Sequence, residues 1–217
     1  MKDYRIIFQK KGIVKYISHL DLNRCMIRAI RRSGLPAWYT EGFHPHLYLM
    51  FPLALSLGTE SICEVMDFRL TEELPPEEIS EKLNSALPEG LHVISVREPH
   101  MQAADITAAE YLVILSAPEI PDLKSVLENF TNQPEILIQK KTKKGFREID
   151  IKSMIIIKNI DIHDADLYLT VILPAGNQEN LNINILTDAV QNYADKPILI
   201  KSACRTKIFS ENYQDFF

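Results

Sequence analysis

The chain has 217 residues, of which 46% are hydrophobic and 24% are charged, and its formal net charge is −5 at pH 7. This composition is typical of a folded globular protein and excludes a disordered chain. The longest apolar-looking run, residues 47–57, contains Pro52 and is too short to cross the roughly 30 Å hydrocarbon core of a bilayer. The first residues lack the long apolar region of a secretory signal. We therefore expect a cytoplasmic protein without a membrane partner.

Neither the cysteines nor the glycines have the spacing of a cofactor site. Cys25, Cys63 and Cys204 are too far apart for a zinc or iron–sulfur motif, so we interpret them as small buried side chains and expect no metal. The glycines lack the close spacing that the dinucleotide fingerprint and the P-loop require. The sequence thus predicts no cofactor and gives only weak support for an enzyme that acts on its own.

Charge is distributed unevenly along the chain. Residues 1–50 contain nine basic and three acidic residues, whereas residues 51–110 contain three basic and twelve acidic ones. An acidic protein that keeps one basic surface for a polyanion shows this asymmetry, and so does a protein whose solvated faces simply balance within the fold. The first block alone does not decide between the two.

The first half of the chain alternates strand and helix patterns. Ser18 lies three residues before Asp21, which is typical of a helix start, and Gly34 ends that helix. The predicted elements are a strand over 4–16 with a basic turn at 10–12, a helix over 19–33, strands over 47–54 and 61–70, a helix over 75–90 and a strand over 91–96. This order, β-α-β-β-α-β, is the ferredoxin-like split motif.

The order repeats after a connector at residues 97–109. The predicted elements are strands over 110–116, 135–141, 167–173 and 198–208, helices over 122–131 and 181–193, and an added strand or hairpin within 143–166. We therefore predict an α+β protein made of two tandem ferredoxin-like domains with antiparallel sheets. The N-terminal domain (1–104) contains a basic helix, and the C-terminal domain (105–217) contains an inserted basic hairpin.

A basic stripe on the first predicted helix is the best candidate for a binding surface. On a helical wheel, Leu22, Cys25, Met26, Ala29 and Ile30 share one face. The opposite face carries four arginines, and three lysines precede the helix: Arg24, Arg28, Arg31, Arg32, Lys10, Lys11 and Lys15. Guanidinium groups match phosphate geometry, and neutralising phosphates releases counterions. The stripe therefore predicts RNA binding.

Two further sets of residues could extend this surface. Tyr39 and Phe43 lie in the loop after the helix, where exposed rings could stack on unpaired bases, whereas we expect Trp38 to pack in the core. A second basic cluster surrounds a predicted turn at Gly145 and consists of Lys140, Lys141, Lys143, Lys144 and Arg147. A basic hairpin tip of this kind also serves solubility.

The candidates for chemistry are weaker. His19, His44 and His46 could supply a general acid and base, or with Asp21 a metal site, but histidines in turns usually do neither. Glu60 and Glu64 share a face of the predicted strand and Asp67 does not. A catalytic carboxylate pair could lie there, although the pattern favours a solvated strand edge.

Several motifs resemble those of the bacterial radical-SAM-linked proteins, which stand alone or follow a radical S-adenosylmethionine enzyme in one chain. The similar segments are Tyr16-Ile17-Ser18-His19-Leu20-Asp21-Leu22, Arg28-Ala29, Arg31-Arg32, Leu35-Pro36, Glu41-Gly42-Phe43-His44-Pro45-His46, Leu57-Gly58-Thr59-Glu60-Ser61, Lys143-Lys144-Gly145 and Asp150-Ile151. The resemblance implies association with such an enzyme. Because this chain lacks the three-cysteine cluster of a radical enzyme, it would be the companion.

We therefore expect an RNA-binding or docking module that presents RNA, such as tRNA or rRNA, to a radical S-adenosylmethionine partner. The partner would dock on acidic residues of the second helix, Glu77, Glu78 and Glu81, or on the open edge of one sheet. One alternative is a metal-independent endoribonuclease, similar at the level of fold to the repeat-processing enzymes of CRISPR systems. Another alternative is a protein-docking adaptor that binds no RNA.

Overall fold

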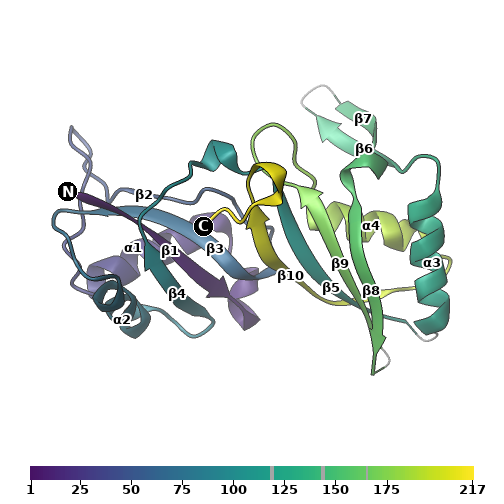
Figure 1. The fold of residues 1–217 in the computed structure, drawn as a ribbon, viewed down its shortest axis with the longest axis horizontal. Coiled ribbons are helices and arrows are strands. Elements are labelled where there is room, and N and C mark those ends of the chain that lie inside the picture. The colour runs from purple at the N-terminus through teal and green to yellow at the C-terminus, as the bar shows by residue number, and fades with distance from the viewer. Residues whose placement is uncertain (118–119, 143–144, 165) are drawn as a thin grey trace. The chain divides into compact units, whose positions relative to one another are not determined.

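The computed structural model describes residues 1–117, 120–142, 145–164 and 166–217. Its contacts divide the chain into two compact units (Figure 1). Unit 1 contains Met1–Ile106 together with Ser210–Phe217, and unit 2 contains Thr107–Phe209. The expected boundary at 104/105 had placed the last eight residues in the second domain, whereas their contacts are with the first unit.

Unit 1 is an antiparallel sheet with two helices. Its elements are β1 (Lys2–Lys10), a 3-10 helix (Gly12–Tyr16), α1 (His19–Arg32), β2 (Leu49–Met50), β3 (Glu60–Leu70), α2 (Pro76–Ala86), β4 (Leu91–Arg97) and a 3-10 turn (Ala103–Asp105). Within this unit the strand order is β4-β1-β3, and the short β2 pairs with the end of β3. All of these pairs are antiparallel.

Both helices of unit 1 bury their apolar sides against the same set of strand residues. Alternate residues of β1, including Ile6 and Phe8, belong to this core with Phe68 of β3. Met26 of α1 and Ile79 of α2 complete it, and each of these five side chains is at most 1% exposed. The apolar residues that recur at every second position in the strand therefore pack in one core with those that recur at helical spacing in α1 and α2.

Two predicted strands of unit 1 are wrong. Residues 13–16 form the 3-10 helix instead, because Gly12 has a φ of +66° and donates its N–H to Glu60 Oε1 at 3.0 Å, which turns the chain out of β1. The strand expected over 47–54 is reduced to Leu49–Met50. Pro52 lies just beyond it and has no N–H to contribute to a strand ladder.

Unit 2 is also an antiparallel sheet with two helices, and it has an additional hairpin. Its elements are β5 (Ala108–Ser116), α3 (Ile120–Asn132), β6 (Leu137–Thr142), β7 (Gly145–Asp150), a 3-10 turn (Lys152–Met154), β8 (Ile156–His163), β9 (Asp166–Pro174), α4 (Ile183–Tyr193) and β10 (Leu199–Phe209). The strand order in this unit is β10-β5-β9-β8, and β6 pairs with β7 in a separate two-stranded sheet.

The sequence-based division of residues 135–166 is therefore partly wrong. We expected the strand over 135–141 to join the main sheet of the second domain and the following segment to be the addition. In the structure, the strand at this position, β6, pairs with β7, and β8 takes the place beside β9 (Figure 1). The inserted hairpin is thus β6–β7.

The protein is a mixed α+β fold in which the described chain contains four α-helices and antiparallel strand pairs. Across the ranges that the structure describes, none of the helices has the length and apolarity needed to cross a membrane.

Candidate nucleic-acid interface

The N-terminus of α1 is held by a local network around Ser18. Its Oγ accepts a hydrogen bond from the Asp21 N–H (3.1 Å), and its hydroxyl donates to Asp21 Oδ2 (2.7 Å). The hydroxyl bond lowers the pKa of Asp21, with a smaller contribution from Arg24, whose Nη1 lies 3.3 Å from Asp21 Oδ1. Ser18 therefore caps the N-terminus of the helix that carries the arginines.

The four arginines of α1 are all exposed, as the helical wheel predicts, while Leu22, Met26, Ala29 and Ile30 are buried. Arg32 Nη2 donates to the carbonyl of Ala86 at the end of α2 (2.7 Å). In the described part of the chain, Arg28 makes no hydrogen bond or ion pair, so its guanidinium faces solvent.

Cys25 lies half-buried beside this face. Burial raises the pKa of its thiol, and the positive charges of Arg32 and Arg28 offset that effect only in part. The thiol is therefore a poor nucleophile at neutral pH.

Arg31 connects the helix to the loop that follows it. Its Nε donates to the Tyr39 hydroxyl (3.2 Å), and its guanidinium carbon lies 5.8 Å from the centre of the Tyr39 ring. Tyr39 is 39% exposed. A cation and an accessible aromatic ring are thus held side by side, an arrangement that suits a phosphate and its neighbouring base.

The loop after α1 is a tight projection. A β-bridge joins Tyr39 to Leu47, and the Thr40 N–H donates to the His46 carbonyl (2.8 Å). Phe43, at the end of this projection, is fully exposed. An apolar ring that is wholly in water has no structural role in the described chain, so it is a candidate stacking residue.

Trp38 packs against neighbouring side chains, but it is half-buried and does not lie in the core as expected. Its ring meets Tyr48 edge-on at 5.9 Å, and the guanidinium of Arg69 lies 5.0 Å from the centre of each ring. Asp3 holds Arg69 with two hydrogen bonds of 2.6 and 3.0 Å, which raise the pKa of the guanidinium. Trp38 therefore belongs to a stacked structural cluster.

Two of the three lysines that precede α1 are held by contacts of their own, so the prediction that all three extend the arginine surface is wrong. Lys10 is only 2% exposed, and its Nζ donates to the carbonyls of Lys15 (3.3 Å) and Ile17 (3.4 Å). Lys15 pairs with Glu60 at 3.7 Å. Lys11 is exposed. Of the three, Lys11 alone is freely accessible to a phosphate, because the carbonyls at the 3-10 helix draw Lys10 inward.

Two of the three histidines make structural contacts. His46 Nδ1 lies 3.0 Å from Thr40 Oγ1 and 3.2 Å from the His44 carbonyl, so this ring stabilises the loop. The His19 ring packs edge-on against Phe51 at 5.1 Å. No three metal-ligating side chains gather anywhere in the described ranges. The geometry gives no paired acid and base at these positions.

The carboxylates of β3 do not form a solvated edge, so that expectation is wrong. Glu64 and Asp67 are buried, and Asp67 accepts two hydrogen bonds from Arg5 at 2.7 and 2.8 Å. Glu60 is occupied by Lys15 and by the Gly12 N–H. These groups hold the sheet and its neighbouring loop together.

The second basic cluster can be placed only in part. Lys143 and Lys144 lie outside the described residues, as do the side chains of Lys140 and Lys141. Arg147 is exposed on β7, opposite Lys140 in the strand register. Beside it, Phe146 is 74% exposed, a residue that the sequence analysis missed because the cluster was identified by charge alone.

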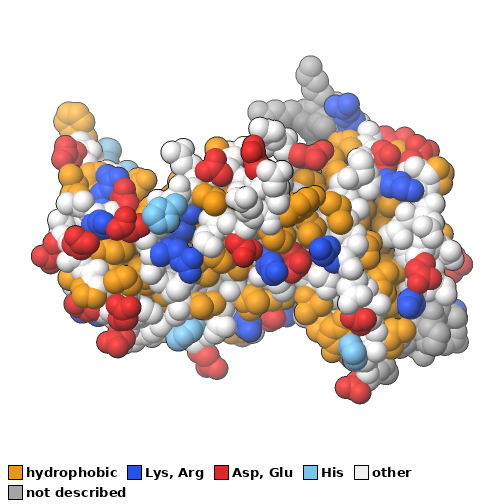
Figure 2. All heavy atoms as spheres, in the orientation of Figure 1, with side chains coloured by type: hydrophobic (Ala, Val, Ile, Leu, Met, Phe, Trp, Pro, Cys, Tyr) orange, Lys and Arg blue, Asp and Glu red, His pale blue; other side chains and the backbone are white. Residues whose placement is uncertain are grey.

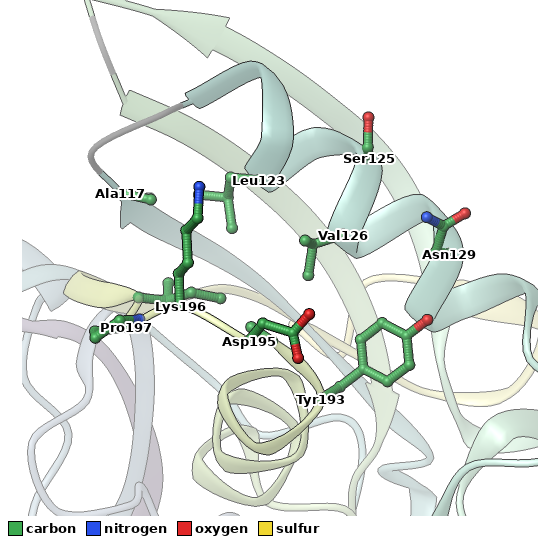
Figure 3. A pocket seen from close by; sticks show the side chains of 11 residues that line it. Ala117, Leu123, Ser125, Val126, Asn129, Tyr193, Asp195, Lys196 and Pro197 are labelled. Carbon is green, nitrogen blue, oxygen red and sulfur yellow. The ribbon is translucent and has the colours of Figure 1, made fainter.

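Unit 2 also contains a hollow that the sequence did not indicate. It has a volume of about 560 Å³ and lies between α3 and the segment after α4. Figure 3 shows Leu123 and Val126 of α3 pointing toward the side that carries Tyr193 and Asp195. Its lining comes from segments far apart in the sequence, so no local motif marks it. Apolar walls with a few polar groups suit a small polar ligand.

Comparison with protein families identifies the chain. Residues 3–183 match the family described as "Uncharacterized protein conserved in bacteria (DUF2344)". The chain belongs to this family. No curated protein matches the sequence.

Solved structures show similarity of fold. A chain in the structure entitled "Crystal Structure of a Cbf5-Nop10-Gar1 Complex" aligns with a TM-score of 0.50 and 13% sequence identity. The alignment covers 96% of this chain and 50% of that chain, so this protein spans about half the length of its structural relative. At this identity the likeness concerns the fold alone.

Proposed function

We propose that this member of the DUF2344 family is an RNA-binding module, and that α1 with the loop after it is the binding surface. The observation that carries the proposal is the exposed arginine face of α1 beside Tyr39 and the fully exposed Phe43. Guanidinium groups would neutralise phosphates, and the rings would stack on unpaired bases.

We propose further that both units are ferredoxin-like. Each unit has the chain order β-α-β-β-α-β once the β6–β7 hairpin is set aside. In each, the first strand lies between the last and the third, as in β4-β1-β3 and β10-β5-β9. A sheet of this kind covered by helices is a rigid platform for an exposed loop such as residues 39–47.

The RNA would be tRNA or rRNA, and the module would present it to a radical S-adenosylmethionine enzyme. The support for this step is the sequence resemblance described above, together with the absence from this chain of closely spaced cysteines that could hold an iron–sulfur cluster. A companion without its own cofactor acts by positioning the substrate, which can lower a reaction barrier by several kcal/mol.

The test is RNA affinity as a function of salt. Replacing Arg24, Arg28 and Arg31 with alanine should weaken binding of an in vitro transcribed tRNA, because three phosphate contacts are lost. The slope of log affinity against log salt should fall by about one unit per lost contact. Fluorescence anisotropy over a salt series measures both quantities.

A matched control removes three exposed lysines of unit 2, Lys124, Lys158 and Lys207. This triple alanine variant has the same net charge as the arginine variant, so an effect of overall charge would appear in both proteins. Equal affinity and equal slope in the arginine variant and the unaltered protein would reject α1 as the binding surface. Absence of measurable tRNA binding by the unaltered protein would instead favour an adaptor that binds protein and no RNA.

The geometry favours binding over cleavage. A metal-independent nuclease needs an acid and a base on opposite sides of the reacting phosphate. The described contacts of His19 and His46 are structural: His19 packs against Phe51, and His46 bonds within its own loop. We therefore expect tRNA to be bound and left intact.

A further inference from the structure

We propose that the groove between α2 and the edge strand β4 binds an extended, basic segment of a partner protein, which pairs with β4 as an additional strand. The inference deepens the partner half of the proposed function and rests on it for the existence of a partner. Its geometry is independent of RNA, so the two ideas can fail separately.

The first observation is that β4 ends the strand order of unit 1. Among the described strands it pairs with β1 alone, from Leu91 to Arg97. In an antiparallel pair every second residue turns its backbone N–H and carbonyl away from the partner strand. An edge strand therefore offers hydrogen-bonding groups to another extended chain.

The second observation is that the protein provides hydrogen-bond partners for the outward-facing backbone groups of β4 only in the first part of the strand. The side-chain amide of Asn84 in α2 acts as a substitute strand beside Val93: Oδ1 accepts from the Val93 N–H (2.8 Å), and Nδ2 donates to the Val93 carbonyl (3.1 Å). The described part of the chain provides no such cover for residues 94–97. This open stretch is about 13 Å long.

The third observation is a groove beside the open stretch. It has a volume of about 380 Å³ and lies between the first turns of α2 and the second half of β4. Pro76, Glu77, Ser80 and Glu81 line one wall, and Ile94, Ser95 and Val96 line the other. A chain that pairs with β4 would therefore also contact α2.

The charge and polarity of the groove walls indicate which residue types the bound partner segment carries. Glu78 is neutralised by Lys82 at 2.7 Å, whereas Glu77 and Glu81 pair with no basic side chain in the described residues. Figure 2, which has the orientation of Figure 1, shows several acidic side chains in the region where Figure 1 draws α2. Ile94 is 52% exposed. Because side chains of a strand alternate, the matching segment has apolar residues against Ile94 and lysine or arginine toward the two glutamates.

The experiment uses the full chain and a labelled probe peptide, acetyl-Lys-Val-Lys-Val-Lys-Val-Lys-amide. We expect saturable binding with a dissociation constant below about 1 mM. Two N-methylated versions of the probe then distinguish strand pairing from simple charge attraction. Methyl groups on one alternate set of backbone nitrogens should abolish binding, and methyl groups on the other set should leave it intact, because only one set faces β4.

The position of the groove is tested by charge reversal. The variant Glu77→Lys/Glu81→Lys should bind the probe about tenfold more weakly or worse. The control Glu72→Lys/Glu89→Lys makes the same change of net charge outside the groove and should bind normally. Absence of binding at about 1 mM, equal binding of both methylated probes, or equal loss in both variants would overturn the proposal. tRNA binding, measured on the same proteins, reports separately on the function of α1.

Discussion

Arg5 is the charged side chain on which several segments of unit 1 converge. It is 1% exposed, and besides the two hydrogen bonds to Asp67 it donates to the Met101 carbonyl at 2.7 Å. The ring of Phe216 lies 4.5 Å from its guanidinium carbon. One side chain thus connects β1, β3, the connector after β4 and the C-terminal tail.

This arrangement predicts that Asp67→Asn destabilises unit 1 strongly. The substitution leaves the shape almost unchanged but removes the negative charge, so the guanidinium remains buried without its counter-charge. The expected loss is about 3–5 kcal/mol of the free energy of unfolding. Urea unfolding followed by fluorescence measures it, since Trp38 is the single tryptophan and lies in unit 1.

The pair Asp3–Arg69 is the comparison for this prediction. Its geometry is equally good, at 2.6 Å, but 29% of the Arg69 side chain and 45% of the Asp3 side chain are exposed. Asp3→Asn should therefore cost only about 0–1 kcal/mol. Equal losses in the two variants would show that burial does not determine the contribution of the Arg5 pair.

At the scale of elements, α1 depends on Ser18 for its start. Ser18→Ala removes the acceptor for the Asp21 N–H and should lower the free energy of unfolding by about 1 kcal/mol. Ser85→Ala is a suitable control, because Ser85 is exposed near the end of α2 and bonds only to the Lys82 carbonyl. We expect the control to change stability by less than about 0.5 kcal/mol.

The loss of stability caused by Ser18→Ala should depend on pH. The Ser18 hydroxyl lowers the pKa of Asp21 in the folded protein. This contribution is present above the pKa of the unfolded chain, about 3.9, and is lost as the pH falls through the lower folded value. The difference between the native protein and Ser18→Ala should therefore narrow below about pH 4. A difference that is constant from pH 7 to the acid range would contradict the assigned role of the hydroxyl.

The elements also show what local sequence could reveal. The position of α1 was predictable because Ser18 and the buried face mark it within the chain, and the exposure of its arginines followed from the same pattern. The burial of Lys10 could not be predicted from the local sequence. The carbonyls that bind its ammonium group come into position only when residues 12–16 form a 3-10 helix. The pairing of β6 with β7 was likewise hidden, because a strand pattern does not specify its partner.

At the scale of the molecule, the chain leaves unit 1 after Ile106, builds unit 2, and returns to unit 1 at Ser210. Contacts of this kind between the two ends of a sequence leave no local pattern, which explains why the expected boundary assigned the tail to the second domain. In the structure, Phe216 is 1% exposed and lies beside Arg5. The tail therefore contributes to the core of unit 1.

This path predicts a selective effect of Phe216→Ala. The variant should lose about 3–5 kcal/mol of stability, because a fully buried ring is replaced by a cavity next to the Arg5–Asp67 pair. Hydrogen exchange should quicken in β1 and β3 of unit 1 and remain unchanged in β9 of unit 2. Phe43→Ala serves as the control, since that ring is fully exposed and its removal should leave exchange unaltered. Equal acceleration in both units would mean that they unfold together, and the tail would then not be a specific support of unit 1.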